Sequence, residues 1–259
     1  MEVQKILAPN PSMFTGSGTN TYLLDSAGEI LIVDPGPIIR SHESAIIEAV
    51  DGRLVKGVLV THTHVDHAPL ANPVALRLGV PSYGYTQSAE FVPDVRLQES
   101  DSLVFGAETL DVLHTPGHAA DHLCFLVGKE LFTGDHIMGG STVMIEDLAS
   151  YLKHLMRLRD VPLTRLFPGH GPEISEPYRI IDRYISHRLD REQQVIAAVA
   201  AGAGTIGAVV EDVYADVDPG LYTLAAYSVV AHVTKLRDEG VLAHVEVEEL
   251  WDGVVSLIV

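Results

Sequence analysis

The sequence predicts an α/β protein in which two β-sheets are packed between helices, an αββα sandwich, followed by a small C-terminal winged-helix domain. Three observations lead to this prediction. Short apolar runs alternate with Gly, Pro and Asp in the first half of the chain. Helical patterns lie between some of these runs, as in layered α/β domains. After residue 176 the order changes to three helical stretches followed by a β-hairpin.

The first domain is predicted over residues 1–176. Its strands are apolar runs too short for helices, at residues 21–24, 30–33, 57–61, 110–114, 123–127, 130–132 and 166–167. Helical patterns cover residues 41–50, 68–78 and 147–158. We expect Ser41 to be the N-cap of the first helix, because its hydroxyl can accept a hydrogen bond from a free backbone N–H.

The second domain is predicted over residues 177–259. One long helical stretch covers residues 177–201, and two more cover residues 205–214 and 223–239, the last ending at Gly240. Residues 241–249 and 254–259 flank the turn Trp251-Asp252-Gly253, whose Asp-Gly pair favours a hairpin. Three helices followed by a two-stranded wing is the order of a winged helix-turn-helix.

The amino-acid composition limits which binding partners are expected for this protein. The net charge is −18 and 47% of the residues are hydrophobic. Nucleic-acid binding depends on neutralised phosphates, so a chain this acidic is not expected to bind duplex DNA. No basic stretch leads into an apolar one at the N-terminus, and no run of 18 apolar residues occurs, so we expect a soluble cytoplasmic protein without membrane contact. A homodimer is left open.

The strongest chemical signal is the segment His62-Thr63-His64-Val65-Asp66-His67, which follows an apolar strand. Four side chains that can bind metal lie within six residues. Imidazole and carboxylate together suit zinc and its first-row neighbours, whereas calcium and magnesium prefer oxygen ligands. Along a strand, His62 and His64 would point to the same side, and the turn that follows would aim Asp66 and His67 at a second position.

Three further fragments end apolar strands with a metal-binding residue beside glycine. They are Thr115-Pro116-Gly117-His118, Thr133-Gly134-Asp135 and Pro168-Gly169-His170-Gly171. Glycine lets the backbone turn sharply, so that these side chains can face a shared cleft. Each fragment is ordinary alone, but four such strand ends in this order indicate a metal centre.

This pattern resembles the metallo-β-lactamase superfamily, residue by residue over about residues 1–175. The resemblance implies a metallo-β-lactamase fold in which His62, His64 and His118 hold one metal ion. It implies that Asp66, His67 and His170 hold a second ion and that Asp135 bridges the two. The expected cofactors are therefore two divalent metal ions, with zinc favoured by the ligand types.

A closer resemblance is to the β-lactamase-like protein 2 branch, whose animal members are mitochondrial endoribonucleases. The segments that carry it are Asn10-Pro11, Gly18-Thr19-Asn20-Thr21-Tyr22-Leu23, Gly134-Asp135-His136-Ile137-Met138, Ser141-Thr142-Val143 and Tyr184-Ile185-Ser186-His187-Arg188. That branch also has a C-terminal winged helix. The likeness therefore extends over nearly the whole chain.

Hydrolysis is the chemistry expected of two adjacent divalent ions, which can share a water molecule and lower its pKa to about 7. We expect Asp66 to orient this water and to pass its proton to the leaving group. Thr19 and Asn20 are candidate substrate-binding residues, with a role in the turn as the alternative. His122 and His136 either support ligand residues or fill the core.

The function predicted first is hydrolysis of a small acyl compound, a thioester, ester or lactone, because the surface is acidic and carries no basic run. The alternative is a metal-dependent endoribonuclease acting on single-stranded RNA, which the branch resemblance favours. A third hypothesis is a mononuclear iron dioxygenase of the same fold. A fourth, a DNA-binding module without catalysis, conflicts with the complete ligand set and with a C-terminal domain in which six Lys or Arg oppose thirteen Asp or Glu over residues 178–259.

Overall fold

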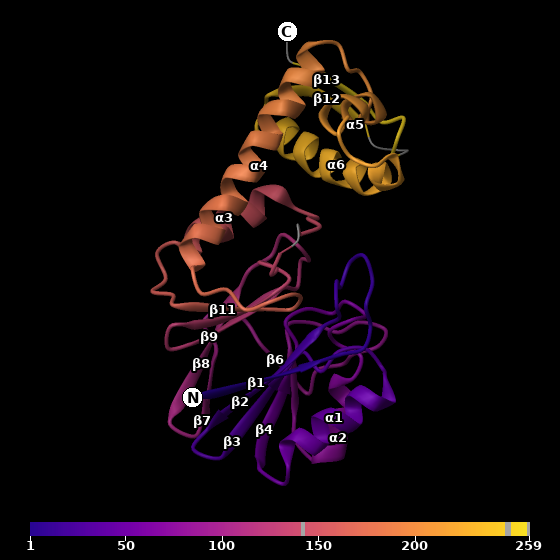
Figure 1. The fold of residues 1–259 in the computed structure, drawn as a ribbon. Helices are drawn as coiled ribbons and strands as arrows, with labels where there is room; N and C mark the ends of the chain where they lie inside the picture. Colours follow the sequence, from indigo (N-terminus) through magenta and orange to yellow (C-terminus); the bar gives the residue numbers. More distant parts are fainter. Residues whose placement is uncertain (141–142, 247–249, 258–259) are drawn as a thin grey trace. The chain divides into compact units, whose positions relative to one another are not determined.

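The structure is a computed structural model that describes residues 1–140, 143–246 and 250–257. The chain forms two compact units (Figure 1). Unit 1 comprises Met1–Val143 and Asp160–Tyr178, and unit 2 comprises Met144–Arg159 and Arg179–Val259. Residues 144–159 therefore belong to the C-terminal unit although they precede residue 176, and the boundary near residue 176 stays a prediction.

The first sheet of unit 1 has six strands in chain order, β1 (Glu2–Leu7), β2 (Asn20–Ser26), β3 (Glu29–Val33), β4 (Leu54–Leu59), β5 (Ser82–Gly84) and β6 (Val95–Arg96). Strands β1, β2 and β3 are antiparallel neighbours. From β3 to β6 each strand runs parallel to the next. Helix α1 (Arg40–Val50) connects β3 to β4, and α2 (Ala71–Leu78) connects β4 to β5, as parallel neighbours require a crossover.

The second sheet has five strands, β7 (Ser102–Phe105), β8 (Glu108–His114), β9 (Leu123–Val127), β10 (Glu130–Gly134) and β11 (Arg165–Pro168), in the order β11-β10-β9-β8-β7. Strand β9 is antiparallel to both β8 and β10, and β11 is parallel to β10. Strands β8, β10 and β11 therefore all end at the same edge of the sheet. The loops that leave these three ends carry His118, Asp135 and His170.

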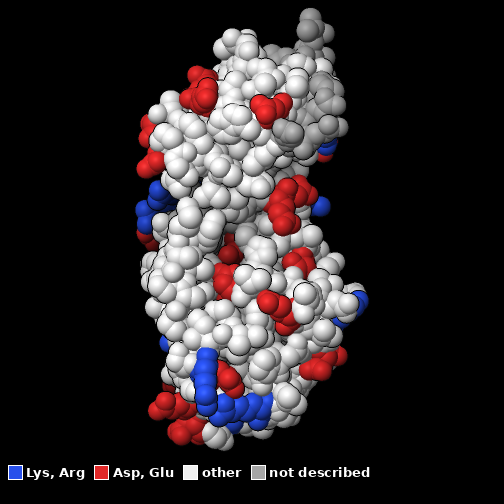
Figure 2. Space-filling model, turned by 90° about the vertical axis from the view of Figure 1, so that its right-hand side faces the viewer, with Lys and Arg blue, Asp and Glu red and all other residues white. Residues whose placement is uncertain are grey.

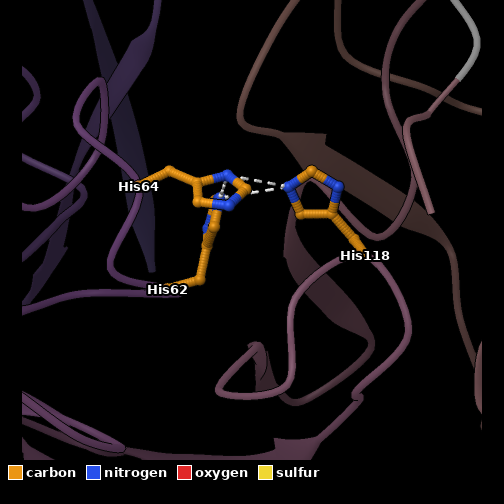
Figure 3. A group of neighbouring side chains, drawn as sticks. All are labelled: His62, His64 and His118. Carbon is orange, nitrogen blue, oxygen red and sulfur yellow. Dashed lines mark hydrogen bonds between the residues drawn. The ribbon is translucent and has the colours of Figure 1, made fainter. Parts of the chain in front are cut away.

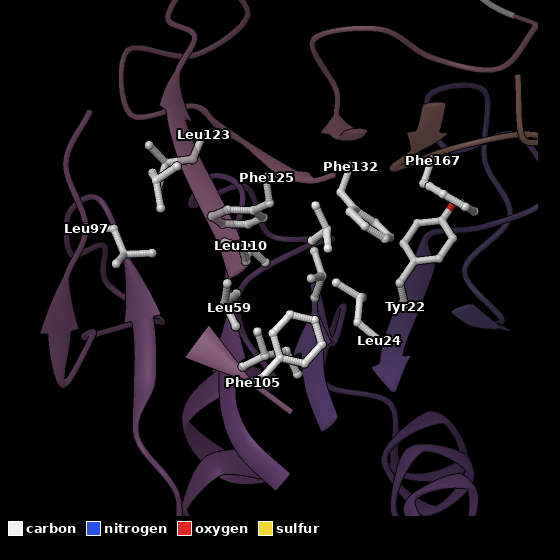
Figure 4. Close-up of a cluster of buried hydrophobic side chains, with 14 residues drawn as sticks. Tyr22, Leu24, Leu59, Leu97, Phe105, Leu110, Leu123, Phe125, Phe132 and Phe167 are labelled. Carbon is white, nitrogen blue, oxygen red and sulfur yellow. The ribbon is translucent and has the colours of Figure 1, made fainter. Parts of the chain in front are cut away.

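The core of unit 1 lies between its two sheets (Figure 4). Alternate residues of each strand face inward, so that Tyr22 of the first sheet packs edge-on against Phe132 and Phe167 of the second. Each large side chain buried in this way stabilises the fold by about 1.5–3 kcal/mol. On its other face, the first sheet packs against Ile46 of α1 and Val74 of α2.

Unit 2 consists of α3 (Leu148–Leu158), α4 (Pro177–Ala200), α5 (Ile206–Val213), the 3-10 helix η1 (Pro219–Leu221), α6 (Tyr222–Asp238), β12 (Leu242–Glu246) and β13 (Val254–Leu257). Thr205 caps α5 by accepting a hydrogen bond from the backbone N–H of Ala208. A core that includes Val209, Val229 and Val233 joins α5 to α6. Among the described residues, no helix combines the length and apolar character needed to cross a membrane.

The predicted α/β fold with two sheets and a C-terminal winged helix is confirmed. The predicted N-cap at Ser41 is wrong, because α1 begins at Arg40, follows Ile39 and has no side-chain cap. The edge strand β1 and the short strands β5, β6 and β7 were not predicted. Residues 247–249 and 258–259 of the predicted wing, and Ser141 and Thr142 of the branch motif, lie outside the described residues.

Candidate metal centre

Four loops bring all seven predicted ligand residues together. The loop after β4 carries His62, His64, Asp66 and His67, and the loops after β8, β10 and β11 carry the other three. His62 and His67 are buried, whereas His64 and Asp66 are partly exposed. The accessible side of the cluster is therefore formed by His64 and Asp66.

Three imidazoles form the first group of potential ligands (Figure 3). His62 Nε2 lies 2.9 Å from His64 Nδ1. His118 Nε2 lies 3.3 Å from His62 Nε2 and 3.1 Å from His64 Nδ1. Three ring nitrogens from two loops thus converge on one point.

The second group consists of Asp66, His67 and His170. His170 Nε2 lies 3.1 Å from Asp66 Oδ2 and 3.2 Å from His67 Nε2. The carboxylate of Asp135 lies between the two groups. Its Oδ2 is 3.7 Å from His118 Nε2 and 3.4 Å from His170 Nε2, and its Oδ1 is 3.5 Å from His67 Nε2.

These donor atoms fit divalent metal ions. Nitrogens held about 2.0–2.1 Å from a tetrahedral zinc ion are about 3.3–3.4 Å from one another, close to the 2.9–3.3 Å separations in the first group. Two imidazole nitrogens that face each other can share at most one proton, so the lone pairs of the ring nitrogens in this group repel one another. A metal cation between the rings would remove this repulsion. Among the described residues, the ion-pair partners of Asp66 and Asp135 are histidines, and no Lys or Arg neutralises these carboxylates.

The electrostatics of the cluster also favour a cation. Burial lowers the pKa of His67, but the surrounding carboxylates of Asp135, Asp66 and Asp34 outweigh it and hold this pKa well above its ordinary value. The pKa of His170 rises to about 9 against the same burial effect, through hydrogen bonds to Asp135 and Asp66. Burial raises the pKa of Asp66, yet the charge of His67 and the hydrogen bond with His170 lower it to about 2. The pocket thus holds ionised carboxylates and attracts positive charge.

Asp34 supports the centre and was missed by the sequence reasoning. Its Oδ2 accepts hydrogen bonds from His67 Nδ1 at 2.9 Å and from the Thr61 hydroxyl at 2.7 Å, and its Oδ1 accepts from the Thr61 N–H at 2.7 Å. The carboxylate therefore fixes the His67 ring with Nε2 facing the cluster. The signal was present, because Asp34-Pro35-Gly36 follows an apolar strand like the other ligand fragments.

Asp121 also supports a ligand loop. Its Oδ2 accepts a hydrogen bond from the Thr63 N–H at 2.9 Å, between the first two histidines of the motif. His122 and His136 are both buried behind the ligands. The His122 ring lies beside the ligand His62, with the ring centroids 5.0 Å apart, and a supporting role for either residue stays a prediction.

Thr19 and Asn20, predicted to bind substrate, lie beneath the His170 loop with 0% and 1% of their surfaces exposed. Asn20 Nδ2 donates to the carbonyls of Pro168 and Gly171, both at 2.9 Å, on either side of His170. Thr19 forms a β-bridge with His170. These contacts hold the loop in place. Substrate contact by either residue stays a prediction.

The chain matches two families of known domains. Residues 14–170 match the metallo-β-lactamase superfamily, and residues 205–251 match the β-lactamase-associated winged helix domain. The first match contains all seven candidate ligands. The second covers α5, α6 and the start of the wing.

Curated relatives and a solved structure extend these matches. The chain is 34% identical to a β-lactamase-like protein 2 homolog of Drosophila melanogaster, over 93% of this chain and 89% of the relative. It is 35% identical to an atrochrysone carboxyl ACP thioesterase of Aspergillus chevalieri, over 79% of this chain and 70% of the relative. A β-lactamase domain protein from Burkholderia ambifaria has the same fold, with a TM-score of 0.84, 23% identity and coverage of 99% and 91% of the two chains. The chain belongs to the metallo-β-lactamase superfamily and is a hydrolase of that fold with a C-terminal winged helix.

Proposed function

We propose that this protein is a zinc-dependent, binuclear hydrolase of acyl thioesters, with esters and lactones as related substrates. The observation that carries the proposal is its similarity to a relative named as an acyl carrier protein thioesterase, together with the full ligand set. A thioester carbonyl is a strong electrophile with a good leaving group. A site that activates water needs no protein nucleophile to hydrolyse it.

The proposed metal ions would be held by the two groups of ligands already described. His62, His64 and His118 would hold one, Asp66, His67 and His170 would hold the other, and Asp135 would contact both. Bound zinc would supply Lewis acidity and would lower the pKa of water to about 7. The residues of the chain then position that water and the acyl group.

Asp66 is the residue proposed to handle protons. Its side chain is 23% exposed, whereas that of Asp135 is 8% exposed, so Asp66 is the more accessible carboxylate. Its Oδ2 faces His67 and His170, and we assign Oδ1 to the attacking water. With a pKa of about 2 it stays ionised, so it orients the water by accepting a hydrogen bond.

The reaction balances without a further reactant. Water adds to the acyl carbon, the carbon–sulfur bond breaks, and the proton released by water passes through Asp66 Oδ1 to the departing sulfur. The products are a carboxylic acid and a thiol. The role of Asp66 is transient proton transfer, because its low pKa disfavours a stable protonated form.

Surface charge favours a small substrate over a nucleic acid. The chain has 17 Lys and Arg against 35 Asp and Glu. On the face shown in Figure 2, acidic side chains are spread over the surface and basic ones form only small groups. Nucleic-acid binding draws much of its affinity from Lys and Arg side chains that neutralise phosphates, so this surface provides few anchors for RNA.

Helix α6, the candidate recognition helix, is poorly suited to duplex DNA. Lys235 is turned inward, with its side chain 10% exposed and its Nζ 2.8 Å from both Glu192 and Glu239. Arg237 pairs with Asp238 at 2.7 Å. Both cations of the helix are therefore neutralised by acidic neighbours, which argues against contacts of this helix with DNA phosphates.

A metal-dependent endoribonuclease acting on single-stranded RNA is the second candidate. It is favoured by the similarity to the β-lactamase-like protein 2 homolog, which spans both units of the chain. The same two ion sites and Asp66 could position water against a phosphodiester. The acidic surface is the observation against it.

The deciding experiment compares substrates on zinc-loaded protein. Acyl thioesters, esters, lactones, bis(p-nitrophenyl) phosphate and single-stranded RNA are assayed with the wild type and with Asp66→Asn, using Asp94→Asn as a control on an exposed loop. We expect thioesters to have the highest kcat/KM and Asp66→Asn to lower it about 100-fold or more. Preference for RNA would replace the thioesterase proposal with the endoribonuclease. Turnover unchanged in Asp66→Asn would refute the role of Asp66.

A further inference from the structure

His122 connects two of the ligand loops from behind the metal centre. Its side chain has no exposed surface. Its Nε2 accepts a hydrogen bond from the backbone N–H of Asp135 at 3.1 Å, and its Nδ1 lies 2.9 Å from Thr115 Oγ1. One ring therefore contacts both the turn that presents Asp135 and the start of the loop that presents His118.

The hydrogen-bond partners of His122 determine which of its ring nitrogens carries the proton. A backbone N–H can only donate, so Nε2 must carry no proton. The proton of the neutral ring then lies on Nδ1 and is donated to Thr115 Oγ1, whose own hydroxyl can turn toward Cys124 Sγ at 3.3 Å. The ring thus presents a fixed acceptor to Asp135.

The backbone of His122 closes the loop that carries His118. Thr115 N–H donates to the His122 carbonyl at 2.9 Å, and His122 N–H donates to the Ala119 carbonyl at 3.3 Å. The imidazole also packs on the ring of His62, with the ring centroids 5.0 Å apart. His122 is therefore in contact with three loops that carry ligand residues.

Gly134 allows this close approach. Its φ is +46°, and a Cβ at this position would lie 2.7 Å from His122 Nε2 and 2.7 Å from Thr61 Oγ1. No side chain fits between the imidazole and the turn. The geometry of the turn before Asp135 therefore depends on the ring behind it.

We infer that His122 is a positioning residue that holds Asp135 between the two groups of ligands through its fixed acceptor nitrogen, and that sets the His118 loop against it. The inference rests on the proposed two-metal function. It concerns metal affinity and not the identity of the substrate. Mutation of a residue that supports a metal ligand typically lowers metal affinity or activity by about 10- to 100-fold.

Two substitutions separate the acceptor from the shape of the ring. His122→Phe keeps a planar ring but loses the acceptor, whereas His122→Gln places an amide oxygen near the position of Nε2. The control is the buried His42→Phe, because the His42 ring is hydrogen-bonded to Thr21 Oγ1 and not to a ligand residue. Zinc affinity is measured by competition with a chromophoric chelator, and exchange of the Asp135 amide hydrogen is followed in the metal-free protein.

We expect His122→Phe to bind zinc about 10- to 100-fold more weakly, with faster exchange of the Asp135 amide, and His122→Gln to recover most of both losses. His42→Phe should keep wild-type affinity. Wild-type affinity and slow exchange in His122→Phe would overturn the inference, as would a folded His122→Gln with no recovery relative to His122→Phe. If His122→Phe does not fold, the same two measurements on His122→Gln against wild type decide, with near-wild-type values supporting the inference and a loss of 10-fold or more overturning it. Because neither readout uses a substrate, failure of the thioesterase proposal would leave this result interpretable.

Discussion

Replacing Asp34 with asparagine tests how strongly the hydrogen bond between Asp34 and the ligand residue His67 controls metal binding. In the wild type, Asp34 Oδ2 accepts a hydrogen bond from His67 Nδ1 at 2.9 Å, which holds a proton on Nδ1 and points Nε2 toward the cluster. Asp34 accepts hydrogen bonds from both the backbone N–H and the hydroxyl of Thr61, each 2.7 Å long. The side chain of asparagine has one oxygen, and we expect this oxygen to stay with the Thr61 N–H, which can only donate. The amide NH2 would then face His67 Nδ1. The ring would have to move its proton to Nε2, where it blocks the metal.

The expected cost follows from the lost bond. A hydrogen bond to a charged group contributes about 1.5–3 kcal/mol, and about 1.4 kcal/mol corresponds to a tenfold change in affinity. We therefore expect Asp34→Asn to weaken zinc binding about 10- to 100-fold, measured by chelator competition on metal-depleted protein.

Asp121→Asn is the matched control for Asp34→Asn. Asp121 accepts a hydrogen bond from the Thr63 N–H, which an amide oxygen can also accept, so we expect a much smaller loss of zinc affinity. Equal zinc affinities for the wild type and Asp34→Asn would refute the argument from the His67 tautomer. Equal losses of zinc affinity in the two variants would show that removal of a nearby negative charge by itself weakens zinc binding.

Three further predictions concern folding and metal. Gly134→Ala should destabilise the protein and weaken metal binding, whereas Gly128→Ala, at a similar φ of +60° with open space around it, should cost only about 1–3 kcal/mol and leave metal affinity unchanged. Glu192→Gln should lower the stability of unit 2 by about 1–3 kcal/mol in urea denaturation at neutral pH. Burial raises the pKa of Glu192, but the nearby His232 and the Lys235 ammonium 2.8 Å away bring it below its ordinary value of 4.5. The stability difference should therefore shrink as the pH falls below 4.5, and a constant difference would contradict this account. Chelation of the metal should lower Tm, because an ion present at about 1,000 times its Kd stabilises the folded state by about 4 kcal/mol.

The fold and the ligand residues could be predicted because both depend on local patterns. Apolar runs define the buried strands, and glycine beside His118, Asp135 and His170 marks the turns at their ends. The structure shows why these turns meet, since β8, β10 and β11 end at the same edge of one sheet. Edge strands were missed because exposed residues interrupt their apolar pattern, as in β1.

The surroundings of the ligands could not be predicted because they depend on contacts between distant segments. Asn20 contacts the carbonyl of Pro168, which is 148 residues away, and nothing near Asn20 in the sequence points to that partner. Thr19 and Asn20 were predicted to bind substrate, whereas the structure buries both side chains against the loop that carries His170. Asp34 shares the strand-end pattern of the ligands, but its support of His67 depends on tertiary packing.

The number of divalent ions bound per chain tests the central proposal most directly. Metal-depleted protein is titrated with zinc, and the bound metal is determined by elemental analysis after removal of the excess. The arrangement of His62, His64 and His118 beside Asp66, His67 and His170, with Asp135 between them, predicts two ions per chain at saturation. Saturation at a single ion, or protein purified with one iron ion and unable to take up a second metal, would contradict a binuclear hydrolase.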